Sequence, residues 1–340
     1  MKQMTPTTMN RSKDMRSKIM LAMRACEPNS ASPTANMMKF HDGNLVTYGG
    51  TFCVQIPCPV DAECAFIPQA LLAFFRKDRE KVTYTLSGDK LTVRSKREKV
   101  TIKCLPSEGM PIIDVHREVT KVKGFLNKKA VKAMLACIDP AEPRSCLQGM
   151  CLRKGLAIGT NGKVCLAMVS NLDVEITCTV PTETLKFIST IDEDVDGIAF
   201  DGINVKFTFP SGMTVCSRTL LADEFPDVRH IINVDGTSPV ILHKDMLEEI
   251  QGIKCGSVEV DNKGVTYVVG NDSSTGHIDL ASEGDFEIRV NKKWFELMLS
   301  LTLKSTVHIS VNRNMLVANG GKFFKMTLAL MVPVNPTDKD

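Results

Sequence analysis

The middle of the chain switches from a helical spacing of apolar residues to a strand-like alternation. In residues 127–138, apolar side chains recur at i, i+3, i+4 and i+7 with lysines at other positions, which is the pattern of an amphipathic helix. Three short alternating runs follow between residues 150 and 169. The Asn161-Gly162 dipeptide between the last two runs is typical of a tight hairpin turn. This stretch therefore predicts one helix followed by antiparallel strands.

The same order of elements recurs three times along the chain, at a spacing of about 110 residues. Each copy consists of a helix, about three strands, a second helix and a closing meander. We therefore expect an α+β fold, with two helices packed on an antiparallel sheet in each of three tandem domains, 1–122, 123–238 and 239–340. The predicted helices are residues 11–26, 68–76, 127–138, 182–191, 244–251 and 292–301.

The composition is that of a folded protein. Of the 340 residues, 43% are hydrophobic and 24% are charged, which excludes disorder and coiled coil as the main architecture. No run approaches the roughly 18 apolar residues of a membrane-spanning helix, and the start lacks the apolar stretch of a secretory signal. Residues 1–24 could be a basic mitochondrial transit helix, but the repeat gives them a place in the first domain. We therefore expect a cytoplasmic protein.

Charge is distributed unevenly. Residues 1–122 hold 19 Lys and Arg against 12 Asp and Glu (+7), whereas 123–238 hold 12 against 14 and 239–340 hold 11 against 13 (−2 each). Basic residues recur on predicted helices of every copy, where they can contact phosphates without reading bases. The alternative is that they only keep exposed helix faces solvated. The candidate DNA-facing residues of this kind are Arg11, Lys13, Arg16, Arg24, Arg76, Lys77, Lys128, Lys132, Lys186 and Lys292.

Metal-binding and catalytic motifs are absent from the sequence. The 12 cysteines form no CxxC pair, and buried reduced thiols are the favoured interpretation. The acidic run Asp192-Glu193-Asp194 resembles a metal loop, although an acidic turn after a helix is the simpler reading. There is no Walker loop, GxSxG elbow or HExxH motif. We therefore expect a non-catalytic protein with no metal or cofactor, while a Cys-His pair formed by folding keeps an enzyme as an alternative.

Four segments, taken in order, give the chain its resemblance to a known family. They are residues 86–95 with Leu105-Pro106, residues 147–150 followed by 159–163, residues 215–218, and residues 225–229. Together they resemble the bacterial DNA polymerase III beta subunit, the sliding clamp, in a divergent form such as a phage might carry. The resemblance spans nearly the whole chain. It implies a head-to-tail homodimer of three-domain crescents that forms a ring, with helices inward and sheets outside.

This resemblance implies a function without chemistry. A ring that encloses duplex DNA slides on weak, sequence-independent contacts, and a replicative polymerase tethered to it becomes processive. The implied partners are double-stranded DNA, the polymerase, a clamp loader, other proteins with a clamp-binding motif, and a second copy of the chain. A clamp-like scaffold that binds peptides without encircling DNA is the alternative.

The resemblance also implies particular site residues. Partners of the family insert a short motif into an apolar pocket between the second and third domains. In the family's DNA-contacting loop, Arg144 is retained, but Ser145 and Cys146 replace two aromatics. Ring closure is expected to bring Val100 and Ile102 of one molecule against the helix near Ile250 of a second molecule. The pocket residues carried over are Leu147, Thr160, Lys163, Val164, Cys165, Pro226, Ile231, Leu330 and Val332, with Lys163-Val164-Cys165 standing where the family usually has His-Arg-Leu.

Overall fold

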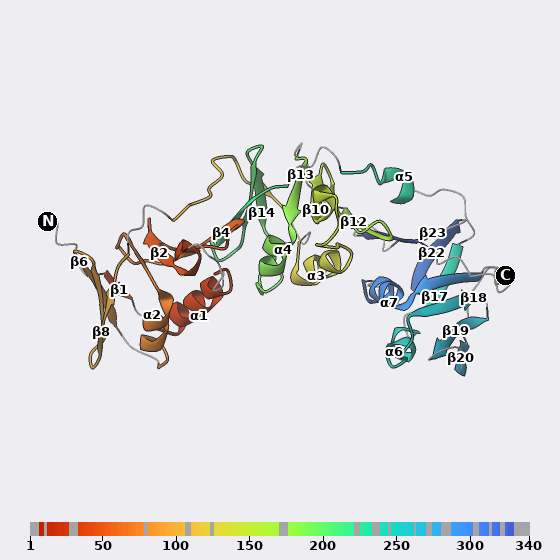
Figure 1. The fold of residues 1–340 in the computed structure, drawn as a ribbon, viewed down its shortest axis with the longest axis horizontal. Helices are drawn as coiled ribbons and strands as arrows, with labels where there is room; N and C mark the ends of the chain where they lie inside the picture. Colours follow the sequence, from red (N-terminus) through yellow and green to blue (C-terminus); the bar gives the residue numbers. More distant parts are fainter. Residues whose placement is uncertain are drawn as a thin grey trace. The chain divides into compact units, whose positions relative to one another are not determined.

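A computed structural model describes most of the chain (Figure 1). All structural statements below concern the described residues, which are 7–9, 12–26, 33–77, 81–105, 110–122, 126–169, 176–220, 225–232, 239–243, 246–261, 263–269, 274–279, 287–301, 306–312, 315–319 and 324–329. The predicted pocket residues Leu330 and Val332 and the predicted DNA-facing Arg11 lie outside them.

The described elements repeat three times in one order: a strand, a helix, four strands, a second helix and three strands. The first copy comprises β1 (Thr7–Met9), α1 (Ser12–Met23), β2 (Met38–His41), β3 (Asn44–Tyr48), β4 (Phe52–Pro57), β5 (Cys64–Phe66), α2 (Pro68–Phe74), β6 (Val82–Ser87), β7 (Lys90–Arg94) and β8 (Lys99–Lys103). A short 3-10 helix, η1 (Pro33–Asn36), precedes β2.

The second and third copies follow the same order. The second comprises β9 (Thr120–Lys121), α3 (Lys128–Ala136), β10 (Gly149–Arg153), β11 (Leu156–Thr160), β12 (Val164–Val169), β13 (Cys178–Pro181), α4 (Thr182–Ile188), β14 (Gly197–Phe200), β15 (Asn204–Thr208) and β16 (Thr214–Arg218), with η2 (Ser145–Leu147) before β10. The third comprises β17 (Pro239–His243), α6 (Met246–Gln251), β18 (Ser257–Asp261), β19 (Gly264–Val269), β20 (Ser274–Asp279), β21 (Glu287–Asn291), α7 (Lys292–Leu301), β22 (Thr306–Asn312), β23 (Met315–Asn319) and β24 (Phe324–Ala329). A one-turn helix, α5 (Arg229–Ile232), lies between these two copies.

The predicted α+β repeat is confirmed. All six predicted helices are present, each ending at or inside its predicted bounds. The prediction missed the strand that opens each copy, because β1 and β9 are only three and two residues long and show no alternation. It also missed β5 and β21, the fourth strand of the first and third copies.

Strands from neighbouring copies join into shared sheets. One eight-stranded sheet has the order β5-β2-β3-β4-β16-β15-β14-β9, and the other has the order β13-β10-β11-β12-β24-β23-β22-β17. The seams are the antiparallel pairs β4–β16 and β12–β24. The remaining strands form two four-stranded sheets, β1-β6-β7-β8 and β20-β19-β18-β21. Strands β8 and β20 are therefore sheet edges.

The chain forms two compact units, and each is described separately. The first unit contains residues 1–128 and 183–220, and the second contains residues 129–182 and 221–340. Each unit is built around one of the eight-stranded sheets. The middle copy thus contributes strands to both units.

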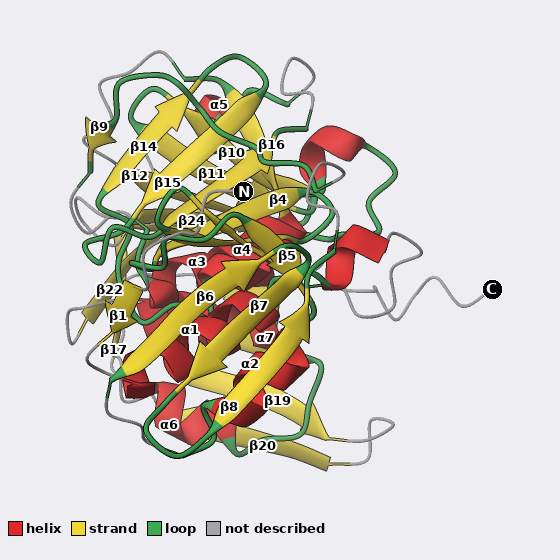
Figure 2. Cartoon of the chain, turned by 90° about the vertical axis from the view of Figure 1, so that its left-hand side faces the viewer, coloured by secondary structure: helices red, strands yellow, loops and turns green. Residues whose placement is uncertain are grey.

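In the first unit, the eight-stranded sheet is covered on both faces. Thr47 of β3, the strand on which α1 packs, lies 3.2 Å from the thiol of Cys26, three residues after the end of α1. Phe52 contacts Phe187 of α4 with ring centroids 5.3 Å apart, so both helices lie on one face. Residues of alternate parity point the other way. There, Cys53 and Cys216 pack with Met110 and Ile113, which belong to the segment after β8. In Figure 2, the strands β6, β7 and β8 of this unit lie in front of the helices α1 and α2.

In the second unit, α3 packs on one face of the sheet at Gly159. A Cβ at this glycine would lie 2.5 Å from the Met134 sulfur and 3.1 Å from Ile138, so the helix approaches the strand as closely as only glycine permits. Lys129 of α3 also donates a hydrogen bond to the Ser300 carbonyl of α7, with a donor–acceptor distance of 2.7 Å. The opposite face of β10, β11 and β12 is covered by the 225–232 segment.

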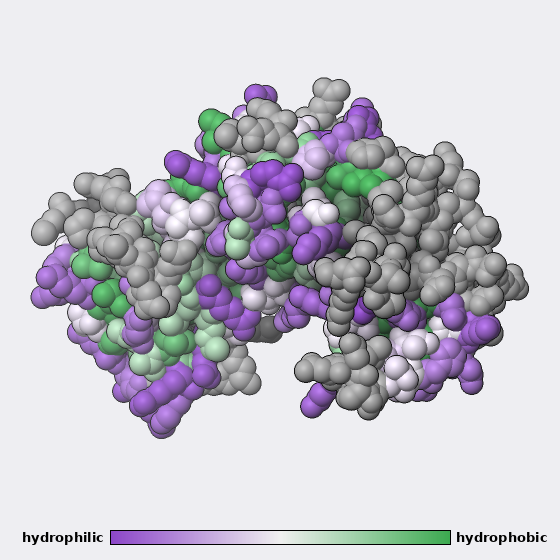
Figure 3. All heavy atoms as spheres, turned by 45° about the vertical axis from the view of Figure 1, so that its right-hand side comes forward, coloured by the Kyte–Doolittle hydropathy of each residue, from purple (hydrophilic) through white to green (hydrophobic). Residues whose placement is uncertain are grey.

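The described surface is largely polar. On the face drawn in Figure 3, hydrophobic residues show as small separate patches among hydrophilic ones. The twelve cysteines are all free; nine are buried and Cys26, Cys104 and Cys255 are half-buried, as expected for reduced thiols in a core. Within the described residues, none of the helices has the length and apolar character needed to cross a membrane.

Candidate functional site

Most of the predicted DNA-facing residues with described side chains are exposed on or beside a helix. Arg16 lies on α1, Lys132 on α3 and Lys186 on α4. Arg24 follows α1 and donates a hydrogen bond to the Thr190 carbonyl at 3.4 Å. Arg76 and Lys77 follow α2, and both are exposed. Lys13 lies on α1, but its side chain is not described.

Three of the predicted cations are engaged in ion pairs. Lys128 pairs with Asp192 at 2.5 Å, and Arg144 pairs with Glu142 at 2.7 Å. Lys292 pairs with Glu296 one helical turn later at 2.8 Å, and only 11% of its side chain is exposed. The charge of Lys292 is therefore largely neutralised within α7, which makes it the weakest of these candidates.

The acidic run 192–196 is held by contacts with its own unit. Asp192 pairs with Lys128, and the Glu193 carboxylate accepts a hydrogen bond from the Ser211 N–H at 2.8 Å. Asp196 accepts hydrogen bonds from the Thr208 hydroxyl and from Lys121, which lower the pKa of its carboxyl. These contacts agree with an acidic turn after a helix.

An apolar cluster in the second unit gathers several of the predicted pocket residues. Leu147, Cys165 and Ile231 belong to it. Thr160 lies directly opposite Cys165 in the β11–β12 ladder, so its side chain points to the same sheet face. The other members of the cluster, which the sequence comparison missed, are Cys146, Cys151, Leu156, Ile158, Ala167, Phe225 and Val228.

The remaining predicted pocket residues lie at the rim or elsewhere. Pro226 is exposed next to buried Phe225, and Lys163 is exposed in the turn before β12. Val164 alternates with Cys165, so it points to the opposite face, which α3 covers, and it is buried there. Val169 lies opposite Leu156 on the cluster's face and is 41% exposed. Leu156 and Ile231 are therefore the partly exposed residues packed against the cluster, and Val169 adjoins Leu156 on the same face.

Arg153 anchors the segment that carries Pro226. Its guanidinium donates a hydrogen bond to the Phe225 carbonyl at 2.6 Å and lies 5.5 Å from the centroid of the Phe225 ring. Asp227 and Arg229 then form a pair with distances of 2.7 to 3.1 Å, and Arg229 holds the pKa of the Asp227 carboxyl well below its usual range. The Phe225-Pro226-Asp227 motif was the sequence signal for this segment, whereas Arg153 had none.

The predicted dimer-interface residues lie in two different settings. Val100 and Ile102 are in the edge strand β8, where Val100 is half-buried and Ile102 is 5% exposed. Ile250 of α6 is completely buried in its own unit. Its side chain therefore supports α6 from inside and is not available at the surface.

The solvent-facing side of the β7–β8 hairpin is strongly basic. Lys90 lies directly opposite Lys103, and Arg94 lies directly opposite Lys99. All four side chains are exposed. Like charges in directly opposite positions of a ladder destabilise it, so this surface favours an acidic partner.

Comparisons with known proteins agree on one architecture. No family model and no curated protein matches the chain. The Bacillus subtilis DNA polymerase sliding clamp matches with a TM-score of 0.81 at 12% identity, over 96% of this chain and 99% of that one.

A putative DNA polymerase III beta subunit from Eubacterium rectale matches with a TM-score of 0.79 at 16% identity, over 96% and 98% of the two chains. The Helicobacter pylori beta clamp bound to a DNA ligase peptide matches with a TM-score of 0.77 at 12% identity, over 96% and 100%. At these identities the likeness concerns the fold. Over nearly its full length, the chain has the fold of the bacterial DNA polymerase III beta subunits, the sliding clamps.

Proposed function

We propose that this protein is a sliding clamp, a DNA polymerase processivity factor that closes around duplex DNA as a head-to-tail homodimer. The observation that carries the proposal is the three-fold repeat in a chain with the clamp fold: it has two internal sheet seams and leaves the equivalent strands β8 and β20 at sheet edges. The basic residues on the helices support it, because they suit sequence-independent phosphate contacts. The protein would act in the cytoplasm of a bacterium or of a phage-infected cell.

A clamp of this kind needs no catalytic site. A closed ring stays on DNA by topology, so its contacts with phosphates can be weak. Weak contacts in turn allow the ring to slide. Tethering a polymerase to the ring raises the effective concentration of the enzyme at the primer end. The protein is thus a non-catalytic accessory subunit that requires no cofactor.

The internal seams indicate which edges would close the ring. In each seam, the third of the four strands between the two helices of one copy pairs with the last strand of the next copy: β4 with β16, and β12 with β24. By the same rule, β20 of the third copy requires the last strand of a following copy, and β8 is the last strand of the first copy. Pairing β20 with β8 of a second molecule satisfies both edges and gives a closed six-domain ring with the predicted domains 1–122, 123–238 and 239–340.

The repeat also gives the register of this pairing. At the seams, Cys53 lies opposite Cys216, and Cys165 lies opposite Thr327. Cys53 pairs with the fifth residue of β3, and Cys165 pairs with the fifth residue of β11. In the third copy, the residue that pairs with the fifth residue of β19 is Thr275 of β20. Cys216 and Thr327 are third from the end of β16 and β24, and the equivalent residue in β8 is Thr101. We expect Thr101 to lie opposite Thr275 of the second molecule.

Charge agrees with this closure. The basic face of the β7–β8 hairpin would adjoin the third predicted domain of the second molecule, and that domain has a net charge of −2. Val100 would lie at the seam, whereas Ile250 would support it only from within α6. Opposite charges at the rim would favour the head-to-tail orientation.

The apolar cluster is the proposed docking site for partner peptides. Its partly exposed residues Ile231 and Leu156, with Val169 opposite Leu156, suit the apolar anchors of a short linear motif. Pro226 is carried over from the family resemblance. Lys163 would lie at the rim, and Leu330 and Val332, which lie outside the described residues, belong to the proposal through the family resemblance alone. The Helicobacter pylori clamp in complex with a DNA ligase peptide supports a peptide-binding role. The replicative polymerase, a clamp loader and other motif-bearing proteins are the proposed partners.

Ring closure is tested by pairing cysteines at the predicted register. The double variant Thr101→Cys/Thr275→Cys should form an intermolecular disulfide on mild oxidation and run at twice the 37.4 kDa of one chain on a non-reducing gel. Each single variant should remain a monomer on the gel, and pairing Thr101→Cys with His277→Cys, two residues along β20, should cross-link less efficiently. A monomer in solution at micromolar concentration, with no cross-link in any variant, would refute the ring and leave a peptide-binding scaffold.

A further inference from the structure

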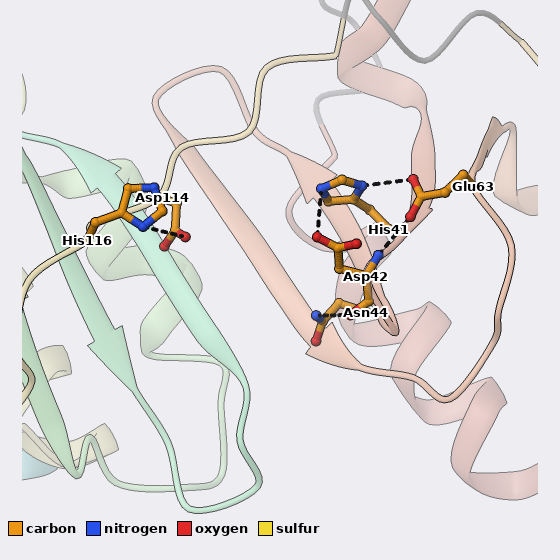
Figure 4. A network of polar contacts seen from close by, with 6 residues as sticks. All are labelled: His41, Asp42, Asn44, Glu63, Asp114 and His116. Carbon is orange, nitrogen blue, oxygen red and sulfur yellow. Dashed lines mark hydrogen bonds and ion pairs between the residues drawn. The ribbon is translucent and has the colours of Figure 1, made fainter.

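Three side chains of metal-ligating type meet at the turn between β2 and β3. His41 ends β2, Asp42 occupies the turn, and Glu63 precedes β5. Each offers a ligand atom within 4.8 Å of the others. Figure 4 shows the His41 ring between the two carboxylates. Within the described residues this is the grouping in which a metal ion could be held, and nothing in the proposed clamp function uses it.

The turn holds Asp42 in a fixed position. Asp42 and Gly43 both have positive φ angles, 46° and 69°, as a two-residue hairpin turn requires. The Asn44 side chain donates a hydrogen bond to the Asp42 carbonyl at 2.9 Å, and the Cys58 N–H donates one to the Gly43 carbonyl at 2.7 Å. The aspartate is therefore preorganised on a rigid turn.

Glu63 orients the imidazole. One of its carboxylate oxygens lies 2.8 Å from His41 Nδ1, and the other accepts a hydrogen bond from the Asp42 N–H at 2.9 Å. A carboxylate at Nδ1 places the ring proton there and leaves the Nε2 lone pair free.

The free nitrogen faces a second carboxylate at a spacing suited to a metal ion. His41 Nε2 lies 3.5 Å from Asp42 Oδ2. Two ligands at about 2.0 to 2.1 Å from a tetrahedral Zn²⁺ ion stand about 3.4 Å apart, so both atoms reach one ion with little movement. Two carboxylates around one imidazole also leave a net negative charge that a cation would compensate.

We propose that His41 Nε2 and the Asp42 carboxylate bind a divalent first-row transition metal, with Glu63 as the outer partner that fixes the histidine. Imidazole and carboxylate ligands suit Zn²⁺ among the available ions. The Asp42 side chain is 82% exposed, so water completes the coordination. The ion would tie the start of β5 to the β2–β3 turn through Glu63.

A second histidine–aspartate pair in the chain provides a matched comparison. His277 Nε2 lies 3.5 Å from Asp279 Oδ1, the same spacing as in the first pair. Its Nδ1, however, lies 3.0 Å from the Thr266 hydroxyl and not from a carboxylate. The two pairs therefore differ in the outer partner that the proposal requires.

Titration calorimetry of the full chain with Zn²⁺ tests the site. We expect one site per chain that Asp42→Asn abolishes, that Glu63→Gln weakens 10- to 100-fold, and that Asp279→Asn leaves unchanged. Asparagine tolerates the positive φ of Asp42, so the first variant should keep its fold. Absence of zinc binding by the unaltered chain would overturn the proposal, as would loss of binding in Asp279→Asn but not in Asp42→Asn.

A thermal measurement gives an independent readout. Because an ion that binds only the folded state stabilises it, saturating Zn²⁺ should raise the melting temperature of the unaltered chain and of Asp279→Asn. The same addition should leave Asp42→Asn unmoved. An equal shift in all three proteins would contradict the assignment to His41 and Asp42.

Discussion

At the scale of single residues, the twelve cysteines differ in their surroundings. Burial raises the pKa of the Cys165 thiol to about 12, and burial also raises the pKa of the Cys26 and Cys255 thiols. Cys104 is the exception, because a hydrogen bond with the Cys64 thiol lowers its pKa while raising that of Cys64. Cys104 follows β8 and Cys64 opens β5, so no sequence spacing indicated this contact.

The thiol of Cys104 should therefore be the most reactive in the folded protein. A lowered pKa gives a larger thiolate fraction at a given pH, and Cys104 is only half-buried. A brief exposure to iodoacetamide near neutral pH, followed by peptide mass mapping, should label Cys104 before Cys26 and Cys255. The nine buried cysteines should remain unlabelled until the chain is unfolded. Faster labelling of Cys26 or Cys255 would contradict the assigned environments.

The pocket residues show what could be carried over from sequence and what could not. The motif around Pro226 located one side of the cluster, and Leu147 and Cys165 located the other. Val164 was assigned to the same site, but strand alternation turns it to the opposite face. Arg153 could not be found, because its role depends on a contact between β10 and a segment far away in the sequence. Val169 could not be found either, because it reaches this face through its pairing with Leu156 of β11.

Ile231 is the residue best suited to a test of the pocket. It is half-buried at the accessible side of the cluster, whereas Leu147 is 1% exposed, so that a charge there would disrupt the core. Ile231→Ala should weaken binding of a clamp-binding-motif peptide by at least about ten-fold with little loss of stability. Ile203→Ala, at an exposed turn of the first unit, is the matched control and should bind normally. Equal binding by both variants in fluorescence anisotropy would refute the pocket.

At the scale of elements, helices were the most predictable features because their apolar residues keep one period over two or more turns. The opening strands were not predictable in the same way. The opening strands are strands because they pair with the closing meander: β1 with β6, β9 with β14 and β17 with β22. Two of them, β1 and β9, are too short to show alternation. The sheet seams were likewise invisible, since strand pairing between copies leaves no local signal.

Two lysines on different helices distinguish DNA contact from stabilisation of the helix itself. Lys132 is exposed on α3, whereas Lys292 is covered and paired with Glu296 on α7. Lys132→Ala should lower the affinity for a short linear duplex and reduce the slope of log K against log salt concentration by about 0.9. Lys292→Ala should change both by less. Titrations at several salt concentrations measure the two effects, and a larger change for Lys292→Ala would reverse the assignment.

At the scale of the whole molecule, the repeat explains more than any single motif. Three copies of one element order account for both eight-stranded sheets, for the two four-stranded sheets, and for the open edges β8 and β20. Each compact unit combines strands of two copies, because the seams join strands of neighbouring copies into shared sheets. Sequence could define the repeat, and only the strand pairing indicates how the repeat would continue into a second molecule.

If two molecules enclose DNA, the cross-linkable variant should remain on a DNA circle without any affinity for it. Thr101→Cys/Thr275→Cys should be oxidised in the presence of nicked circular DNA, washed at high salt, and the DNA then linearised. Covalent rings should stay on the circle through the wash and be released when the DNA is cut, because topology and not affinity retains them. Equal retention on circular and linear DNA, or loss from the circle during the wash despite complete cross-linking, would contradict encirclement.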